Sequence, residues 1–209
     1  MSRQADPPVG ERIREERIKR KISLRGLARD IGVSASLISQ IETGKCRPSV
    51  STLYAITTAL SVSIGNVFSS PGAEPAPLIA ATVSSHLGGQ LAALAPQSYG
   101  PLVRADEREL LRLDSGVTWE RLGHVPGAGV DFLLITYAQG GSSSSDGQLM
   151  RHSGTEYGYL IEGELILTLG SAEHRIRSGQ SVSFPSPTPH RYRNDASRPA
   201  VGVWFVSDR

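Results

Sequence analysis

The sequence predicts an α + β protein with two domains, an all-α domain followed by an antiparallel β domain. Across residues 10–70, apolar residues recur at steps of three and four, as on the buried face of a helix. From about Leu102 onwards, short runs of alternating apolar and polar residues are separated by Gly, Pro and Asn, which is typical of β-sandwiches and barrels. The expected segments are a flexible arm at 1–9, the helical domain at 10–70, a partly docked linker rich in Ala, Pro, Gly and Ser at 71–104, and the β domain at 105–209.

The composition argues against several classes of protein. No apolar run reaches the length of about 18 residues that a membrane helix needs. The first twenty residues lack the apolar stretch of a secretory signal. Cys46 is the only cysteine, which rules out an internal disulfide framework and fits a reducing compartment. We therefore expect a cytoplasmic protein.

The charge is distributed unevenly along the chain. Residues 1–70 carry 11 Lys and Arg against 6 Asp and Glu, whereas residues 71–209 carry 11 against 14. The overall formal charge of +2 thus hides a basic first third and an acidic remainder. A basic segment favours a polyanionic partner, and the remainder is expected to have a different role.

Five short helices are expected in the first domain, because glycine and proline residues interrupt the apolar pattern at regular intervals. One helix begins at Ser23, a tight turn follows at Gly32, and a second helix runs from Ala35 to Thr43. This is the order of a helix-turn-helix, whose second helix enters the major groove of DNA. Further N-caps are expected from Ser34 and from either Ser49 or Ser51.

The second helix of this unit has one apolar and one polar face. Ile38 and Ile41 are expected to face the core, and the outward residues carry short polar side chains that can reach base edges. Gln40 is the best candidate for direct readout, because an amide can pair with adenine through two hydrogen bonds. The outward set is Ser36, Ser39, Gln40 and Thr43.

Residues 10–68, and "SASLISQIETGKCRPS" in particular, resemble the phage-repressor-like (XRE) family of helix-turn-helix proteins, which have the lambda-repressor fold. The resemblance implies an operator in double-stranded DNA as the partner and a salt bridge between Arg17 and Glu42. Leu24 stands where many members have a glutamine that binds phosphate, so that contact is not expected here. The residues expected to contact DNA are Ser34, Ala35, Ser36, Ser39, Gln40 and Thr43. In and after the next loop, Lys45, Arg47 and the backbone near Ser49 are expected to contact phosphates.

The alternative for this segment is a small helical bundle whose basic residues form only a solvated surface. The turn glycine, the caps, the apolar spacing and the sign of the charge all agree with a DNA reader instead. Such readers normally dimerise over two half-sites, so we expect a homodimer or a larger homo-oligomer.

In the β domain, the stretch "RHSGTEYGYLIEG" suggests half of a metal site. If this segment is extended, alternation puts Met150, His152, Gly154 and Glu156 on one face, and imidazole and carboxylate together can bind a divalent ion. His190, in "GQSVSFPSPTPHRYRN", can supply a third ligand.

Both stretches resemble the paired motifs of the cupin family, which are small antiparallel β-barrels of the jelly-roll kind. The resemblance covers residues 105–209 and implies that His152, Glu156 and His190 are metal ligands. Met150 stands where the family has a further histidine, and Pro187 where it has a glycine. The implied cofactor is one divalent ion, Zn²⁺, Fe²⁺, Mn²⁺ or Ni²⁺.

A pocket without metal, in which the two histidines only form hydrogen bonds, is the alternative. In either case, the inward residues of the barrel could line an effector pocket or simply fill the core. These candidate pocket residues are Met150, Tyr137, Tyr159, Tyr192, Trp119 and Trp204.

Two functions fit these domains. The first is a transcriptional regulator whose cupin domain binds a small-molecule effector, dimerises the protein and modulates operator binding. The second is a non-haem oxygenase or epoxidase with an accessory helix-turn-helix domain, since two histidines and a carboxylate also hold iron in oxygenases. The intact caps, Gln40 and the basic loop favour the regulator, which has no catalytic residue, over the enzyme.

Overall fold

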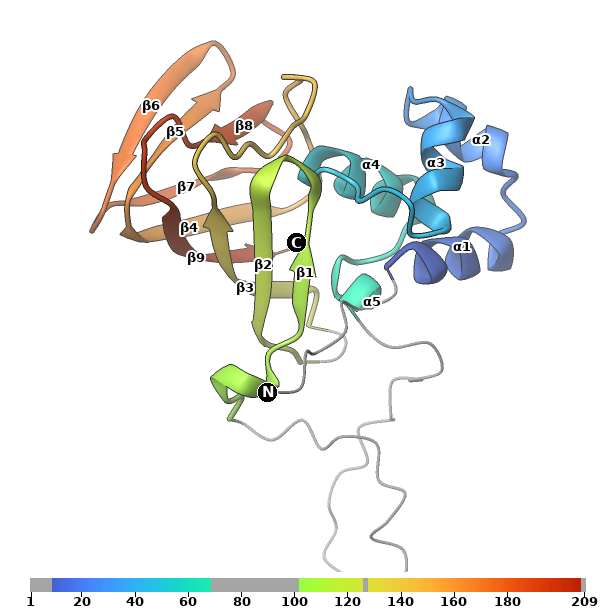
Figure 1. Cartoon of the computed structure of the whole chain (residues 1–209), viewed down its shortest axis with the longest axis horizontal. Helices are drawn as coiled ribbons and strands as arrows, with labels where there is room; N and C mark the ends of the chain where they lie inside the picture. The colour runs from blue at the N-terminus through green and yellow to red at the C-terminus, as the bar shows by residue number, and fades with distance from the viewer. Residues whose placement is uncertain (1–8, 69–101, 126–127, 208–209) are drawn as a thin grey trace, which may run out of the picture.

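The computed structural model describes residues 9–68, 102–125 and 128–207 of the chain. It contains a helical domain and a β-barrel, connected by residues 69–101 (Figure 1). Of the expected arm at 1–9, Val9 belongs to the first helix and residues 1–8 lie outside the described residues, as does most of the expected linker at 71–104. Within the part of the chain that the structure describes, no helix is long and apolar enough to cross a membrane.

The first domain consists of four helices of seven to eleven residues and one final helical turn. The N-caps predicted at Ser23 and Ser34 are confirmed, and of the two alternatives for the next helix Ser49 is the cap. The helices are α1 (Val9–Lys19), α2 (Leu24–Asp30), α3 (Ala35–Glu42), α4 (Val50–Leu60) and α5 (Gly65–Phe68).

The helix-turn-helix is formed by α2 and α3. Gly32 has a φ of 72°, a left-handed conformation that glycine adopts without steric cost, and it turns the chain between the two helices. Ile38 and Ile41 lie in the core, as predicted. The predicted salt bridge is also present, since Arg17 Nε lies 2.6 Å from Glu42 Oε1 and Arg17 Nη2 lies 2.8 Å from Glu42 Oε2. This two-pronged contact fixes α1 against the end of α3.

The second domain is an antiparallel barrel of two sheets, as predicted. One sheet has the strand order β1-β2-β3-β9-β4-β7 and the other has the order β6-β5-β8. Large side chains from both sheets, among them Trp119, Leu160 and Tyr192, fill the space between them. The strands are β1 (Leu110–Arg112), β2 (Val117–Gly123), β3 (Val130–Tyr137), β4 (Thr155–Glu162), β5 (Glu164–Leu169), β6 (Ala172–Arg177), β7 (Ser181–Pro185), β8 (His190–Arg193) and β9 (Ala200–Ser207).

The segment before β4 is less extended than the sequence suggests. Residues 151–154 lie outside any strand, and Gly154 has a φ of 90°, which turns the chain into β4. The alternation of side chains along a strand therefore does not explain why His152 and Glu156 lie close together. The turn at Gly154 brings the two side chains together. Both side chains are nevertheless buried, as the prediction required.

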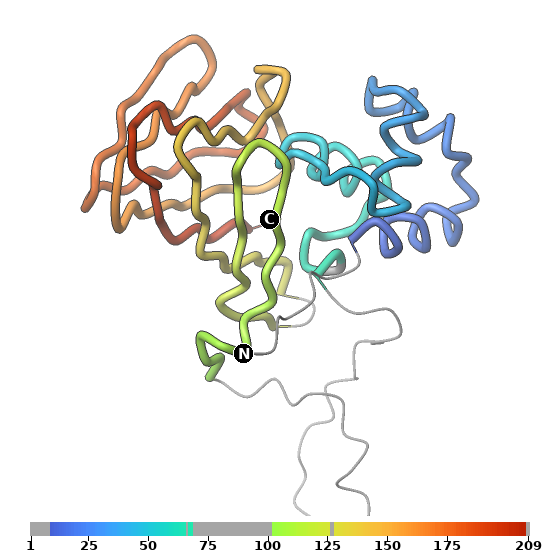
Figure 2. Tube along the Cα trace, viewed as in Figure 1, coloured from blue at the N-terminus to red at the C-terminus, as the bar shows by residue number. Residues whose placement is uncertain are grey.

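Helix α4 lies between the barrel and helices α2 and α3 (Figures 1 and 2). The ring of Tyr54 meets Trp119 of β2 edge to face, with ring centroids 5.9 Å apart. At the start of α4, the Ser51 amide donates a hydrogen bond of 2.9 Å to the Ser143 carbonyl of the barrel. The two domains therefore share one continuous hydrophobic core.

A buried arginine makes the second contact between the domains. Arg121 of β2 is 5% exposed, and its Nη2 donates a hydrogen bond of 2.5 Å to the Gly65 carbonyl of α5. Its guanidinium also lies 4.9 Å from the centre of the Phe68 ring, and Glu109 holds Nη1 at 2.6 Å. A buried guanidinium is costly without partners, so these contacts favour the docked arrangement.

We expect Tyr54→Ala to lower the free energy of unfolding by about 3 kcal/mol, because the substitution removes an aromatic ring from the shared core. Thr58→Ala, at an exposed position of the same helix, should change it by less than about 0.5 kcal/mol. Chemical denaturation followed by circular dichroism measures both. Equal stabilities of the two variants would show that the domains do not pack through Tyr54.

Candidate functional site

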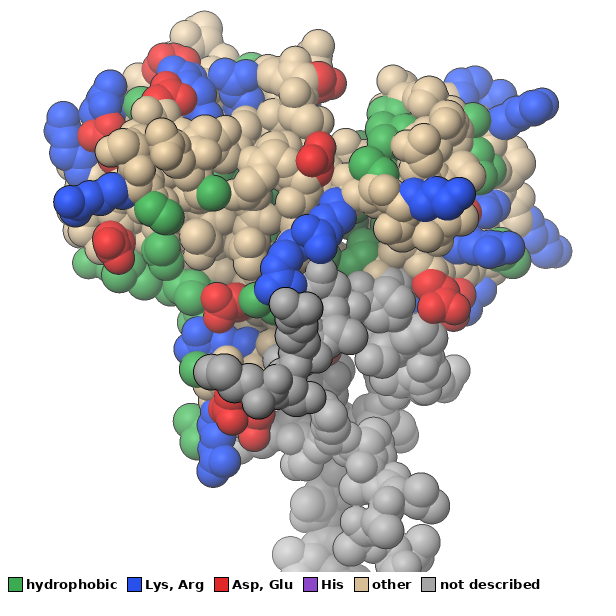
Figure 3. Space-filling model, in the orientation of Figure 1, with side chains coloured by type: hydrophobic (Ala, Val, Ile, Leu, Met, Phe, Trp, Pro, Cys, Tyr) green, Lys and Arg blue, Asp and Glu red, His purple; other side chains and the backbone are tan. Residues whose placement is uncertain are grey.

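The predicted DNA-contact residues lie mostly on one exposed surface. Ser36 and Gln40 are exposed on α3, Ala35 and Ser39 are partly exposed beside them, and Thr43 is exposed just after the helix. Lys45 and Arg47 are exposed in the loop after α3. Several Lys and Arg side chains also lie on the side of the helical domain farthest from the barrel (Figure 3). A helix with short polar side chains and basic neighbours is the arrangement that a major-groove reader needs.

Two hydroxyl groups on this surface have structural partners. Ser34 Oγ accepts a hydrogen bond from the Leu37 amide as the cap of α3. Thr43 Oγ1 donates a hydrogen bond of 2.7 Å to the Ser39 carbonyl. In this conformation, Gln40 is the α3 residue whose long polar side chain is exposed toward solvent.

The Ser49 side chain is not available for a DNA contact, since the residue is only 3% exposed. Its hydroxyl caps α4 by accepting from the Thr52 amide, and it also lies 2.9 Å from the Ser51 hydroxyl. The start of α4 faces the barrel, where Ser51 bonds to Ser143, so Ser49 belongs to the interface between the domains.

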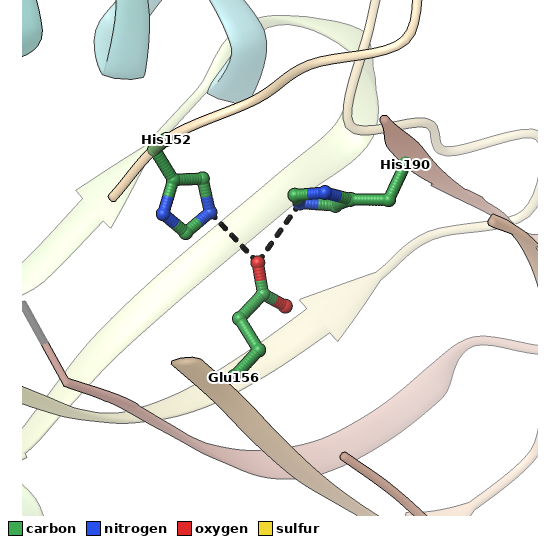
Figure 4. Close-up of side chains that lie close together, drawn as sticks. All are labelled: His152, Glu156 and His190. Carbon is green, nitrogen blue, oxygen red and sulfur yellow. Dashed lines mark hydrogen bonds and ion pairs between the residues drawn. The ribbon is translucent and has the colours of Figure 1, made fainter. Parts of the chain in front are cut away.

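His152, Glu156 and His190 meet inside the barrel (Figure 4). His152 comes from the loop before β4, Glu156 from the second position of β4 and His190 from the start of β8. Their potential ligand atoms all lie within 4.8 Å of one another. Glu156 Oε1 is 2.8 Å from His152 Nε2 and 2.9 Å from His190 Nε2. Sequence reasoning thus identified three residues that the fold brings together.

The backbone fixes the orientation of both imidazole rings. His152 Nδ1 lies 3.0 Å from the Ser153 carbonyl, and His190 Nδ1 lies 2.7 Å from the Thr188 carbonyl. A carbonyl oxygen can only accept, so each Nδ1 carries the hydrogen. Each Nε2 then points at Glu156, and in a neutral ring this atom is an acceptor.

Two acceptors directed at one carboxylate oxygen require a proton or a cation between them. His190 Nε2 is buried and has no hydrogen-bond partner among the described residues, although it lies close to Glu156 Oε1. Burial alone raises the pKa of the Glu156 carboxyl, but the two neighbouring histidines outweigh burial and lower this pKa to about 2. The donor set of two imidazole nitrogens and one carboxylate, together with the unpartnered nitrogen, fits a divalent metal ion.

A second layer of side chains orients the carboxylate. The Tyr192 hydroxyl donates a hydrogen bond of 3.1 Å to Glu156 Oε2, and the Trp204 indole donates one of 3.2 Å to the Tyr192 hydroxyl. Burial, followed by the charge of Glu156, raises the pKa of Tyr192, so its hydroxyl keeps its proton. Gly158 allows this arrangement, because a Cβ there would lie 2.8 Å from the Trp204 ring.

Met150 lies next to this group. Its side chain is 7% exposed, and its backbone forms two hydrogen bonds with His190, one in each direction. The position that the cupin resemblance assigns to a histidine is therefore beside His190 in space, but it carries a thioether.

A residue that sequence analysis missed completes the surroundings of the three ligands. The Tyr54 ring of α4 stacks on the His152 ring, with centroids 3.9 Å apart and planes within 5°. In the sequence, Tyr54 belongs to the apolar pattern of a helix in the other domain, so no local signal associates it with His152. The helical domain thus reaches the candidate metal site directly.

The remaining candidate pocket residues divide into two groups. Tyr137, Trp119 and Trp204 are each at most 2% exposed and lie inside the barrel with Tyr192. Tyr159 was placed wrongly, since it is 49% exposed on the outer face of β4. Glu156 points inward, and side chains alternate along a strand, so the residue three positions later points outward.

Comparison with known proteins supports the assignment of both domains. Residues 13–66 match the helix-turn-helix family and residues 133–206 match the cupin domain family. The chain is 25% identical over 190 residues to the HTH-type transcriptional regulator PuuR of Escherichia coli, covering 90% of this chain and 88% of the relative. It is 26% identical over 182 residues to the HTH-type transcriptional regulator SutR of Escherichia coli, covering 87% of this chain and 84% of that relative.

The same two-domain fold occurs in a solved structure. A helix-turn-helix family transcriptional regulator from Vibrio cholerae superposes with a TM-score of 0.64 at 21% identity, covering 96% of this chain and 94% of that one. The order of the two domains is therefore shared along almost the full length.

We expect Tyr192→Phe to lower the free energy of unfolding by about 1–3 kcal/mol, because it leaves Glu156 Oε2 and the Trp204 indole without their shared partner. Tyr157→Phe, at a side chain that is 51% exposed, should change stability by less than about 0.5 kcal/mol. Thermal unfolding of both variants beside the unsubstituted protein measures the difference. If Tyr192→Phe matches Tyr157→Phe, the Tyr192 hydroxyl does not support Glu156.

Proposed function

We propose that this chain, which joins an XRE-type helix-turn-helix domain to a C-terminal cupin domain, regulates transcription by binding an operator with α3. The observation that carries this proposal is the surface formed by α3 and the loop after it, in which the capped helix exposes Gln40 and the loop exposes Lys45 and Arg47. A regulator of this kind acts in the cytoplasm. The regulator names of the two curated relatives support the same role.

The DNA-binding features of α3 and the loop after it favour a transcriptional regulator over an enzyme. The oxygenase alternative rests on the three candidate ligands, which serve a sensor equally well. An enzyme with an accessory helical domain has no need of an exposed Gln40 and a basic loop in the arrangement that reads DNA. We further propose that the protein acts as a homodimer, because two readers are needed to span two half-sites.

We also propose that His152, Glu156 and His190 hold one divalent ion, Zn²⁺, Fe²⁺, Mn²⁺ or Ni²⁺. The unpartnered His190 Nε2 and the charged Glu156 support this. When bound, such an ion supplies a Lewis acid with open positions for a small molecule. Met150 stands where the cupin family has a further histidine, so the ion would have three protein ligands and would keep the remaining positions open.

We expect Gln40→Ala to reduce discrimination at one base pair of the operator by about 1–3 kcal/mol, because the amide would no longer pair with the base edge. Lys45→Ala should instead weaken binding to all sequences alike and reduce its salt dependence, because a lysine there would contact phosphate. The measurement is fluorescence anisotropy on duplexes that the unsubstituted protein selects from a random library, at several salt concentrations. A failure to enrich any sequence would contradict the regulator.

We expect His152→Ala and His190→Ala to lower the metal content of untagged protein at least about tenfold. His174→Ala is the matched control, because His174 is exposed on β6 and lies outside the candidate site. Elemental analysis of the purified proteins, each after the same equilibration with Zn²⁺ and Mn²⁺, gives the comparison. Equal metal contents in all three variants would remove the ligand assignment.

A further inference from the structure

A cleft of about 350 Å³ lies where the two domains meet. One wall is the C-terminal half of α4 with the turn that follows, including Tyr54, Thr58 and Ser61. The other wall is His152 and Ser153, from the loop before β4. The cleft has the size of a small-molecule site, and neither domain forms it alone.

The cleft is continuous with the three candidate ligands through His152. One edge of this ring carries Nε2, which faces Glu156, and one face of the ring lies against Tyr54. A molecule in the cleft therefore contacts a ring that is shared by the barrel and the helical domain. This places the cleft on the helical side of His152, outside the packed aromatic side chains of the barrel interior.

The lining determines the kind of molecule that would fit. Six of the nine lining residues carry a hydroxyl group, and none is Lys, Arg, Asp or Glu. Hydroxyl groups donate and accept hydrogen bonds, but they do not neutralise a charge. A charged ligand would lose its hydration in the cleft without gaining a counter-ion from these residues. The chemistry of the lining favours an uncharged molecule that is rich in hydrogen-bonding groups.

We propose that this cleft is a binding site for a small uncharged polar molecule that contacts α4 and His152 at the same time. The regulatory consequence rests on the proposed function: a ligand that bridges the two walls stabilises one placement of the helical domain on the barrel and so shifts operator affinity. The site itself does not depend on DNA binding.

Acetamide and acetate are suitable probes, because they have nearly the same shape and differ in charge. Each is titrated into the full-length protein labelled with ¹⁵N, and amide chemical shifts are followed. We expect acetamide to shift amides of Thr58, Ser61 and Ser153 and to bind at least about threefold more tightly than acetate. Shifts confined to other parts of the protein, or acetate binding as tightly as acetamide, would overturn the proposal.

Thr58→Trp tests the location. Thr58 is exposed on α4, so the helix can accept a larger side chain there, and an indole at this position fills part of the cleft. Ser183→Trp, at an exposed and uncharged position of β7 away from the cleft, is the control. We expect Thr58→Trp to abolish the acetamide shifts and Ser183→Trp to retain them. Unchanged acetamide binding in Thr58→Trp would overturn the proposal, and the comparison of the two probes on the unsubstituted protein remains decisive if Thr58→Trp does not fold.

Operator affinity of the same two variants separates this inference from the proposed function. If the cleft controls DNA binding, Thr58→Trp changes the affinity for a selected duplex severalfold and Ser183→Trp does not. If the unsubstituted protein enriches no DNA sequence, the proposed function fails, and the acetamide titration still decides whether the cleft is a binding site. Equal affinities of Thr58→Trp and the unsubstituted protein would overturn the regulatory part of the inference.

Discussion

The buried carboxylate of Glu156 is the constraint around which the β domain is organised. Glu156 is 2% exposed, so its charged carboxylate requires partners on several sides. These partners are His152, His190 and Tyr192. These residues come from three separate parts of the barrel, so the sheets have to bring β4, β8 and the loop before β4 to one place. Trp204 supports Tyr192 from β9, and Gly158 leaves room for its ring. The site is therefore held by the same contacts that close the barrel.

The helical domain is in direct contact with the residues around Glu156. Tyr54 stacks on His152 and meets Trp119 edge to face, which joins the core of the helix-turn-helix to the core of the barrel. Arg121 forms the second connection, from β2 to the Gly65 carbonyl. A change in the position of His152 has to be accommodated by α4, which packs directly against α1 and α2 of the reader. This physical continuity is what would allow a ligand near His152 to act on DNA binding.

Local patterns predicted much of the structure, and long-range packing explains most of what they missed. The caps at Ser23 and Ser34 follow from side-chain chemistry within one helical turn, and the contact of Arg17 with Glu42 followed from the family resemblance. Tyr159 was misplaced because it was treated as an aromatic residue without regard to its alternation with Glu156. The family resemblance placed the backbone near Ser49 at phosphates, and the burial of this residue was not foreseen because the docking of α4 on the barrel cannot be seen in the sequence. Tyr54 was missed for the same reason, since its partner lies 98 positions further along the chain.

We infer that the site at Glu156 and the DNA-reading surface are energetically coupled, because Tyr54 of α4 stacks on His152 and α4 packs against α1 and α2. Coupling of this kind is reciprocal, so bound DNA must change the affinity of the site by the same factor by which an occupied site changes the affinity for DNA. The most direct measurement is calorimetric titration of Mn²⁺ into the full-length protein, first alone and then saturated with a selected duplex. We expect the two Kd values to differ by at least about fivefold. Equal Kd values would show that the two domains, although packed together, bind their partners independently.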